Sequence, residues 1–263
     1  NASCGCNAYQ DHEGPSPAEQ KNHLLGKAGS IMRTLALETA SLTASVAVVE
    51  NGRVLGELTT SHAKTHSQQL VPMIQSLMEL LDLKADQFDL YAASIGPGSF
   101  TGLRIGIVTA KGMAYAQKKP VCGIPTLDAL AYSVNDFNGV ICPMMDAKNN
   151  QVYTAVYRKN NGDFRRISDY YALPVIELAG ILADFREEIL ILGDGAPLHH
   201  STVKNAVKYP VWQADKALFL PRAACTALLA EKQAQCGTIS SPFELEPLYL
   251  RKSQAERMRE LNA

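Results

Sequence analysis

The chain has 263 residues, of which 46% are hydrophobic and 19% charged, and its formal net charge is −1. This composition is ordinary for a globular protein, and the sequence holds no apolar run of about 18 residues that would suit a membrane-spanning helix. The near-neutral charge also excludes a general binder of nucleic-acid backbones, because that activity needs many Lys and Arg contacts to phosphate.

Residues 1–31 differ in character from the rest of the chain. The segment is polar, lacks hydrophobic periodicity and has no apolar middle of the kind found in signal peptides. We therefore expect a disordered leader or a tag, with Met32 as the natural start. The segment holds 2 of the 25 basic and 3 of the 26 acidic residues, which leaves 23 of each in the remainder.

After residue 32, regularly spaced apolar residues predict an α/β order for the first half of the chain. Asn51-Gly52, between two alternating apolar runs, is a strong hairpin signal. The order is three strands, then helix, strand, helix, strand and helix. The predicted strands are 33–38, 45–50, 53–59, 89–95 and 120–124, and the predicted helices are 66–83, 99–117 and 126–133.

From Gly139 the same order of elements can be followed a second time. The repeat lies in the order of elements and not in the letters, and it predicts two domains, 32–137 and 138–263, each with the order βββαβαβα and a mixed sheet. The predicted strands are 140–146, 151–158, 165–171, 188–194 and 209–214, and the predicted helices are 174–185, 197–207 and 221–235.

Five segments along this plan resemble the bacterial TsaB (YeaZ) family: "LALETASLTASVAV", "THSQQLVPMI", "GPGSFTGLRIG", "MDAKNNQVYTAVY" and "EPLYLR". The likeness runs from Met32 to Arg251, and "GPGSFTGLRIG" is its most specific part. It implies a duplicated actin-like ATPase (ribonuclease H-like) fold. It also implies a non-catalytic accessory subunit that binds and supports TsaD. That enzyme forms N6-threonylcarbamoyladenosine next to the anticodon of tRNAs that read codons starting with A.

The resemblance also implies partners and cofactors. We expect a heterodimer with TsaD, contact with the ATPase TsaE through the complex, a homodimer when the chain is alone, and tRNA bound only indirectly. No cofactor is expected in the isolated protein, whereas ATP or ADP and a metal ion are expected on partner subunits. The scattered cysteines form no Cys-x-x-Cys pair, which fits a reducing cytoplasm. The alternative is an ATP-dependent small-molecule kinase or ATPase of the same superfamily.

Predicted strands end at Glu38, Asp146 and Asp194, which makes these acidic residues candidates for binding a nucleotide. In ATPases of this superfamily an acid at the end of the first strand orients Mg²⁺ or water, and Glu38 takes that position here. The turns after Glu38 and Asp146 lack the glycines that let backbone approach a phosphate. We expect Glu38 to face solvent or cap a threonine, and Gly193 and Gly195, which flank Asp194, to turn the chain.

Metal and nucleophile sites are also not expected. His62 and His66 are four residues apart, but they precede the apolar period of the first helix and have no third ligand nearby in sequence. TsaD-type proteins carry two metal-binding histidines where this chain has Thr126 and Leu130. Ser99 lacks the Gly-x-Ser-x-Gly frame of a nucleophile elbow and is expected to cap a helix. His199 and His200 have no evident acidic partner.

Two helices remain as candidates for function. Their apolar arc is wide, and glycine and alanine recur at every fourth position of the second helix, which allows close approach of another helix. Packing inside the domain stays open as one explanation, but with the resemblance included we expect a partner-facing surface. Gly96, Pro97, Gly98 and Ser99 would position the docking helix. The expected interface residues are Leu70, Met73, Ile74, Leu77, Gly102, Leu103, Gly106, Ile107, Ala110 and Ala114.

Overall fold

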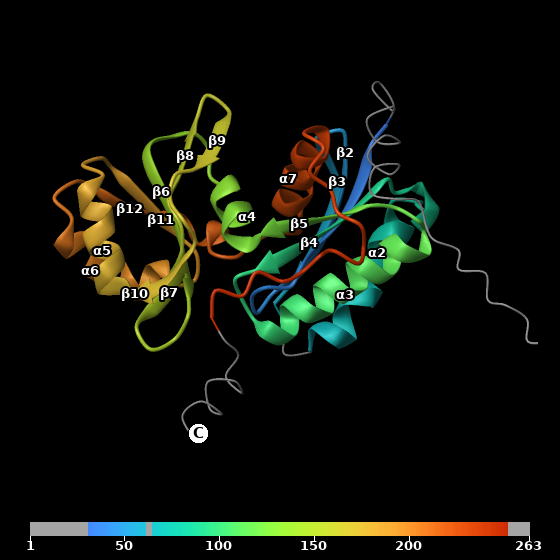
Figure 1. Ribbon diagram of the computed structural model, residues 1–263, viewed down its shortest axis with the longest axis horizontal. Helices are drawn as coiled ribbons and strands as arrows, with labels where there is room; N and C mark the ends of the chain where they lie inside the picture. Colours follow the sequence, from blue (N-terminus) through green and yellow to red (C-terminus); the bar gives the residue numbers. More distant parts are fainter. Residues whose placement is uncertain (1–30, 62–64, 252–263) are drawn as a thin grey trace, which may run out of the picture.

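The computed structural model describes residues 31–61 and 65–251, which form two neighbouring sheets with their helices (Figure 1). The predicted leader, apart from Ile31, and His62 lie outside these residues. Among the described helices, none combines the length and the apolar character needed to cross a membrane.

The first half of the chain forms a five-stranded mixed sheet with the order β3-β2-β1-β4-β5. β1 and β2 pair antiparallel, whereas β1, β4 and β5 run parallel. Asn51 and Gly52 have positive φ angles of 48° and 78°, as the predicted tight turn between β2 and β3 requires. The elements are β1 (Arg33–Glu38), β2 (Ala44–Glu50), β3 (Arg53–Thr60), α2 (His66–Leu80), β4 (Leu90–Gly96), α3 (Phe100–Ala116), β5 (Val121–Pro125) and α4 (Thr126–Tyr132).

The second half repeats this topology, because its main path is β10-β7-β6-β11-β12. In both sheets the first strand lies in the middle, with an antiparallel pair on one side and parallel strands on the other. The predicted duplicated fold is confirmed. The elements are β6 (Phe137–Asp146), β7 (Gln151–Thr154), β10 (Tyr171–Pro174), α5 (Val175–Asp184), β11 (Ile189–Leu192), α6 (Ala196–Ala206) and β12 (Val211–Gln213).

Two predicted strands of the second half are wrong. Residues 151–158 are divided between β7 and a further strand, β8 (Tyr157–Asn160). Residues 165–171 do not form a single third strand, because β9 (Asp163–Arg166) ends before β10 begins. β9 pairs with β8 in an additional hairpin, and β8 pairs back onto β6. Asn161 and Gly162, with φ angles of 51° and 80°, make the turn of this hairpin.

The last helix, α7 (Ala223–Gln235), does not complete the second half as expected. It packs on the first sheet, against β1, β2, β4 and β5. Its buried alanines, among them Ala227 and Ala230, share a core cluster with Ala36, Val49 and Leu90. The two sheets therefore do not divide the chain at a single point, and the domain boundary at residues 137 and 138 stays a prediction.

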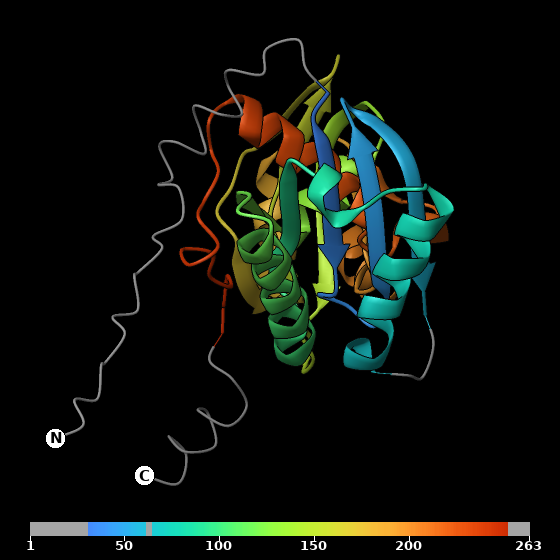
Figure 2. The ribbon, with the colours of Figure 1, turned by 90° about the vertical axis from the view of Figure 1, so that its right-hand side faces the viewer.

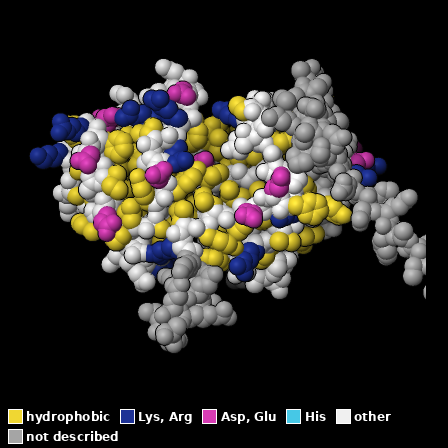
Figure 3. Space-filling view, viewed as in Figure 1, with side chains coloured by type: hydrophobic (Ala, Val, Ile, Leu, Met, Phe, Trp, Pro, Cys, Tyr) yellow, Lys and Arg dark blue, Asp and Glu magenta, His cyan; other side chains and the backbone are white. Residues whose placement is uncertain are grey.

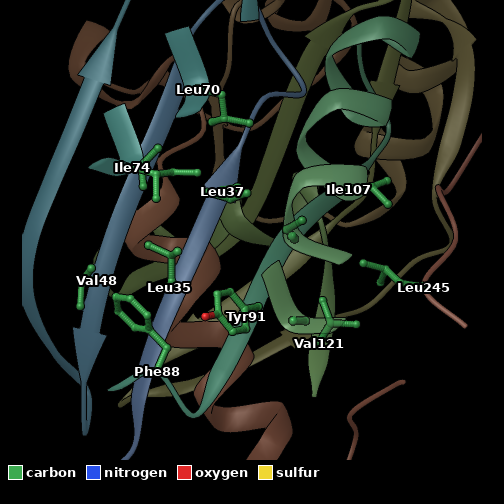
Figure 4. Close-up of a cluster of buried hydrophobic side chains, with 14 of the residues drawn as sticks. Leu35, Leu37, Val48, Leu70, Ile74, Phe88, Tyr91, Ile107, Val121 and Leu245 are labelled. Carbon is green, nitrogen blue, oxygen red and sulfur yellow. The ribbon is translucent and has the colours of Figure 1, made fainter. Parts of the chain in front are cut away.

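The first sheet is covered on both faces. α7 lies on one face of the sheet, and α2 and α3 lie on the other. Figure 2 shows α2 and α3 on their face. Figure 4 shows side chains of the sheet, among them Leu35, Leu37 and Tyr91, meeting Leu70 and Ile74 of α2 and Ile107 of α3. A sheet with parallel central strands and two covered faces has near-continuous apolar strands, as β1 and β2 do here.

Candidate functional site

The small-residue ridge of α3 faces the core of its own half. Gly102, Gly106, Ala110 and Ala114 are all buried. A Cβ atom on Gly102 would lie 2.1 Å from the Thr39 carbonyl oxygen, and one on Gly106 would lie 2.3 Å from Thr39 Oγ1. The glycines let α3 approach the turn between β1 and β2, where Thr39 Oγ1 donates a hydrogen bond to the Gly102 carbonyl at 2.8 Å.

Most of the predicted interface is therefore wrong, and packing within the domain, the alternative left open, describes these residues. A helix that covers a sheet turns its most regular apolar stripe inward, so periodicity alone marked the core-facing side. Met73 differs because it is only partly buried at the edge of the core. The large side chains that prove to be core are Leu70, Ile74, Leu77, Leu103 and Ile107, each at most 4% exposed.

The loop before α3 positions that helix against the same turn. Ser99 N donates to the Ala40 carbonyl at 2.8 Å, and a Cβ atom on Gly98 would lie 2.3 Å from that same oxygen. Ser99 Oγ accepts a hydrogen bond from Gly102 N at 3.2 Å, so the predicted helix cap is confirmed. Gly96 has a φ of 116°. Gly96 and Pro97 are buried, and this loop holds α3 against the turn between β1 and β2.

Glu38 lies inside the protein, so the expectation that it faces solvent is wrong. It is fully buried, and its Oε1 accepts a hydrogen bond from Ala40 N at 2.8 Å. Ser94 Oγ donates to Oε2, and Thr226 of α7 also bonds to this carboxyl group. Burial raises the pKa of Glu38 to about 7, although these hydrogen bonds oppose the rise. Its carboxyl oxygens are thus occupied by groups of the chain.

The acids of the second half are bound in the same way. Asp194 Oδ1 accepts a hydrogen bond from Asp146 N at 3.0 Å, and burial raises the pKa of Asp194. Burial opposes a lower pKa for Asp146, but hydrogen bonds and charge from Lys148, whose Nζ lies 2.6 Å from Oδ2, bring it below its usual value. Cβ atoms on Gly193 and Gly195 would lie 2.3 and 2.9 Å from the Met144 carbonyl oxygen, so these glycines turn the chain beside β6.

Several residues that were not expected to bind a metal or to take part in nucleophilic catalysis lie in helices α2, α4 and α6. Thr126 and Leu130 are both fully buried in or beside α4. His66 Nε2 lies 2.9 Å from the Ser41 carbonyl oxygen, at the start of α2, and His200 Nε2 lies 3.4 Å from that of Val211. Within residues 31–61 and 65–251, no group of three or more His, Cys, Asp or Glu side chains could hold a metal ion.

The segment of residues 240–251, which we call the strap, joins the two halves. It pairs with β5 through Val121 and Ser240, and Leu248 N donates to the Ile95 carbonyl at 2.7 Å. At its end the Arg251 guanidinium donates to the Ala147 carbonyl at 2.9 Å, in the turn between β6 and β7. The strap thus runs from β5, past the end of β4, to a hairpin turn in the second half.

The strap and α3 border an exposed apolar groove of about 620 Å³. Val108 and Tyr115 of α3 are 66% and 63% exposed, and Phe243 of the strap is 75% exposed. Lys111 Nζ donates to the Leu245 carbonyl at 3.1 Å and so ties the two walls together. Figure 3 shows hydrophobic side chains on this part of the surface. We call Val108, Tyr115 and Phe243 the apolar stripe.

Sequence reasoning missed the apolar stripe as a site. Apolar spacing groups Val108 with Leu103 and Ile107, which prove to be core, although Val108 lies on the same side as the charged Arg104, four residues before it. The signal available in the sequence was an apolar side chain that follows a charged residue on the outer side of an amphipathic helix. The strap could not be placed beside α3 from sequence, because the contact joins residues more than 120 positions apart.

Comparisons with known proteins show which family the chain resembles. A family model described as "TsaD: tRNA N6-adenosine threonylcarbamoyltransferase" matches residues 53–257. The Bacillus subtilis (strain 168) "tRNA threonylcarbamoyladenosine biosynthesis protein TsaB" is 29% identical over 226 residues, covering 86% of this chain and 96% of that protein. A Haemophilus influenzae protein of the same name is 31% identical over 234 residues, covering 82% and 92%. The solved structure "YeaZ from Pseudomonas aeruginosa" is similar with a TM-score of 0.72 and 27% identity, covering 83% of this chain and 100% of that one.

Proposed function

The chain belongs to the TsaB family of tRNA threonylcarbamoyladenosine biosynthesis proteins, and from that membership we propose that it is a non-catalytic subunit that docks onto a TsaD-type enzyme. The observation that carries the proposal is the apolar stripe on α3 and the strap. Contiguous exposed apolar side chains on a soluble protein mark surfaces that other proteins cover.

The docking surface we propose extends from the apolar stripe onto helix α2. Val108 and Tyr115 project from the outer side of α3, whose inner side is core. The neighbouring helix α2 adds Val71 and Leu80, which are 49% and 74% exposed. A partner that covers these side chains removes them from water, which stabilises a complex by about 25 cal/mol for each Å² of apolar surface buried, less the entropy lost on association.

The state of Glu38 supports a role without catalysis. A carboxylate that orients a metal ion or a water must present an oxygen to the ligand, whereas the oxygens of Glu38 accept hydrogen bonds from Ala40, Ser94 and Thr226. The turn that follows Glu38 is in contact with the residues that begin α3. These contacts disfavour the alternative of an ATP-dependent kinase or ATPase.

The remaining roles follow from docking. We propose that any nucleotide and metal ion of the reaction belong to partner subunits, and that an ATPase partner is reached through the complex. Without its partner the chain would pair with a second copy through the same apolar stripe, because exposed helix surfaces of this kind self-associate. We propose that the complex acts in the cytoplasm, because its tRNA substrate is there.

The test of docking is a change of one exposed valine. Val108→Glu should weaken the complex with TsaD at least tenfold in calorimetric titration and leave the melting temperature unchanged, because Val108 is 66% exposed in the folded chain. The matched control is Val54→Glu, at a 42% exposed position on β3. Equal binding by both variants would show that the partner does not use α3.

A further inference from the structure

The hairpin β8–β9 is an addition to the duplicated plan. In the first half the second strand passes to the third through the tight turn at Asn51 and Gly52, whereas in the second half β8 and β9 lie between β7 and β10. Four of the 25 basic residues of the chain but one of its 26 acidic residues lie between Tyr157 and Arg166. The other 21 basic and 25 acidic residues leave the remainder of the chain net negative. Figure 3 shows Lys and Arg side chains gathered in this region.

One side of the hairpin is fixed on the body of the protein. Tyr157 is buried and stacks on Phe164 with ring centres 5.5 Å apart, and its hydroxyl donates to Asp128 of α4 at 2.7 Å. Lys159 Nζ donates to the Tyr132 and Val134 carbonyls at 2.7 and 2.6 Å. Both strands are therefore held in place before any ligand binds, which lowers the entropy cost of binding there.

The other side carries two arginines directly opposite each other. Arg158 and Arg165 are partners in the β8–β9 register, and successive side chains of a strand alternate between its sides. Like charges at opposed positions destabilise a sheet. Glu187 forms an ion pair with Arg158, but the side chain of Arg165 is exposed and makes no hydrogen bond or ion pair with any residue in 31–61 or 65–251.

We propose that this outer side of β8–β9 binds backbone phosphate of the RNA substrate, with Arg165 as the principal contact. Guanidinium groups bind phosphate through paired hydrogen bonds. A phosphate bound by the side chains of Arg158 and Arg165 would reduce the repulsion between these two arginines. The inference rests on the proposed function for the identity of the RNA. It changes the expectation that tRNA is reached only through the partner.

The test is a salt series of tRNA binding to the complex of this chain with TsaD. Arg165→Glu should weaken binding several-fold at low salt, and Arg165→Gln should weaken it less. Both should reduce the slope of log K against log salt by about one, the value for one phosphate contact. The control, Lys204→Glu on the exposed side of α6, makes the same charge change and should bind as the wild type does.

Two outcomes would overturn the inference. One is an unchanged affinity and slope in Arg165→Glu, and the other is weaker association of Arg165→Glu with TsaD in the absence of RNA, which would make the hairpin a protein-binding surface. The same series is run on the isolated chain at low salt. If the wild-type chain and TsaD form no complex, the proposed function fails, and the isolated chain still tests whether Arg165 contacts RNA.

Discussion

Glu38 changes its charge state near neutral pH, because burial raises its pKa to about 7. Its carboxyl group takes hydrogen bonds from Ala40, Ser94 and Thr226, so its environment favours a structural role. The position of an acid at the end of β1 was predicted from sequence. Its burial was not, because Thr226 comes from α7, almost 190 residues further along the chain.

This burial gives a pH-dependent stability. The pKa of Glu38 rises from 4.5 to about 7 on folding, so the folded state binds the proton more tightly. The resulting stabilisation is full below about pH 4.5 and is lost as the pH rises through about 7, with an upper magnitude of about 3 kcal/mol. Glu38→Gln lacks this dependence. Its stability relative to wild type, measured by urea unfolding, should therefore rise from pH 5 to pH 8, and a constant difference would contradict this account.

At the scale of single elements, α3 has two sides with different tasks. The inner side contacts the turn after β1 through Gly102 and Gly106, and the outer side carries Val108 and Tyr115. Two substitutions on this helix distinguish the packing contact that a glycine makes from the effect of glycine on helix stability. Gly106→Ala places a Cβ atom 2.3 Å from Thr39 Oγ1, whereas Gly112→Ala meets nothing within 4 Å.

We therefore expect opposite changes in thermal stability from the two variants. Gly106→Ala should destabilise the chain by about 1–3 kcal/mol, the usual cost of overpacking. Gly112→Ala should stabilise it by about 0.5–1 kcal/mol, because alanine is the better helix former. Equal melting temperatures would mean that α3 does not press against the turn.

Sequence patterns located the elements but not all of their neighbours. Apolar spacing placed α2, α3 and the strands of the first sheet, because these signals are local. The glycines of the ridge, Gly102 and Gly106, were correctly marked as a close contact, but their neighbour is Thr39 and not a partner helix. The hairpin β8–β9 was missed although Asn161-Gly162 is a turn signal, because each strand has four residues and a weak period.

At the scale of the whole molecule, the C-terminal part of the described chain binds the two halves together. α7 returns to the first sheet, and the strap runs from β5 past β4 to Ala147 in the second half. Such returns join distant residues, so no local pattern predicts them. They give α3 a fixed place beside the strap, where Val108, Tyr115 and Phe243 form one surface.

The central claim is that this surface, and not the acid at the end of β1, supports tRNA modification. The most direct measurement is the rate of threonylcarbamoyladenosine formation by TsaD and its other partners with wild-type chain, Glu38→Gln or Val108→Glu added at equal concentration. The account predicts that Glu38→Gln supports the wild-type rate and that Val108→Glu, although folded, supports little or none. Full activity with Val108→Glu together with loss of activity in a folded Glu38→Gln would contradict it.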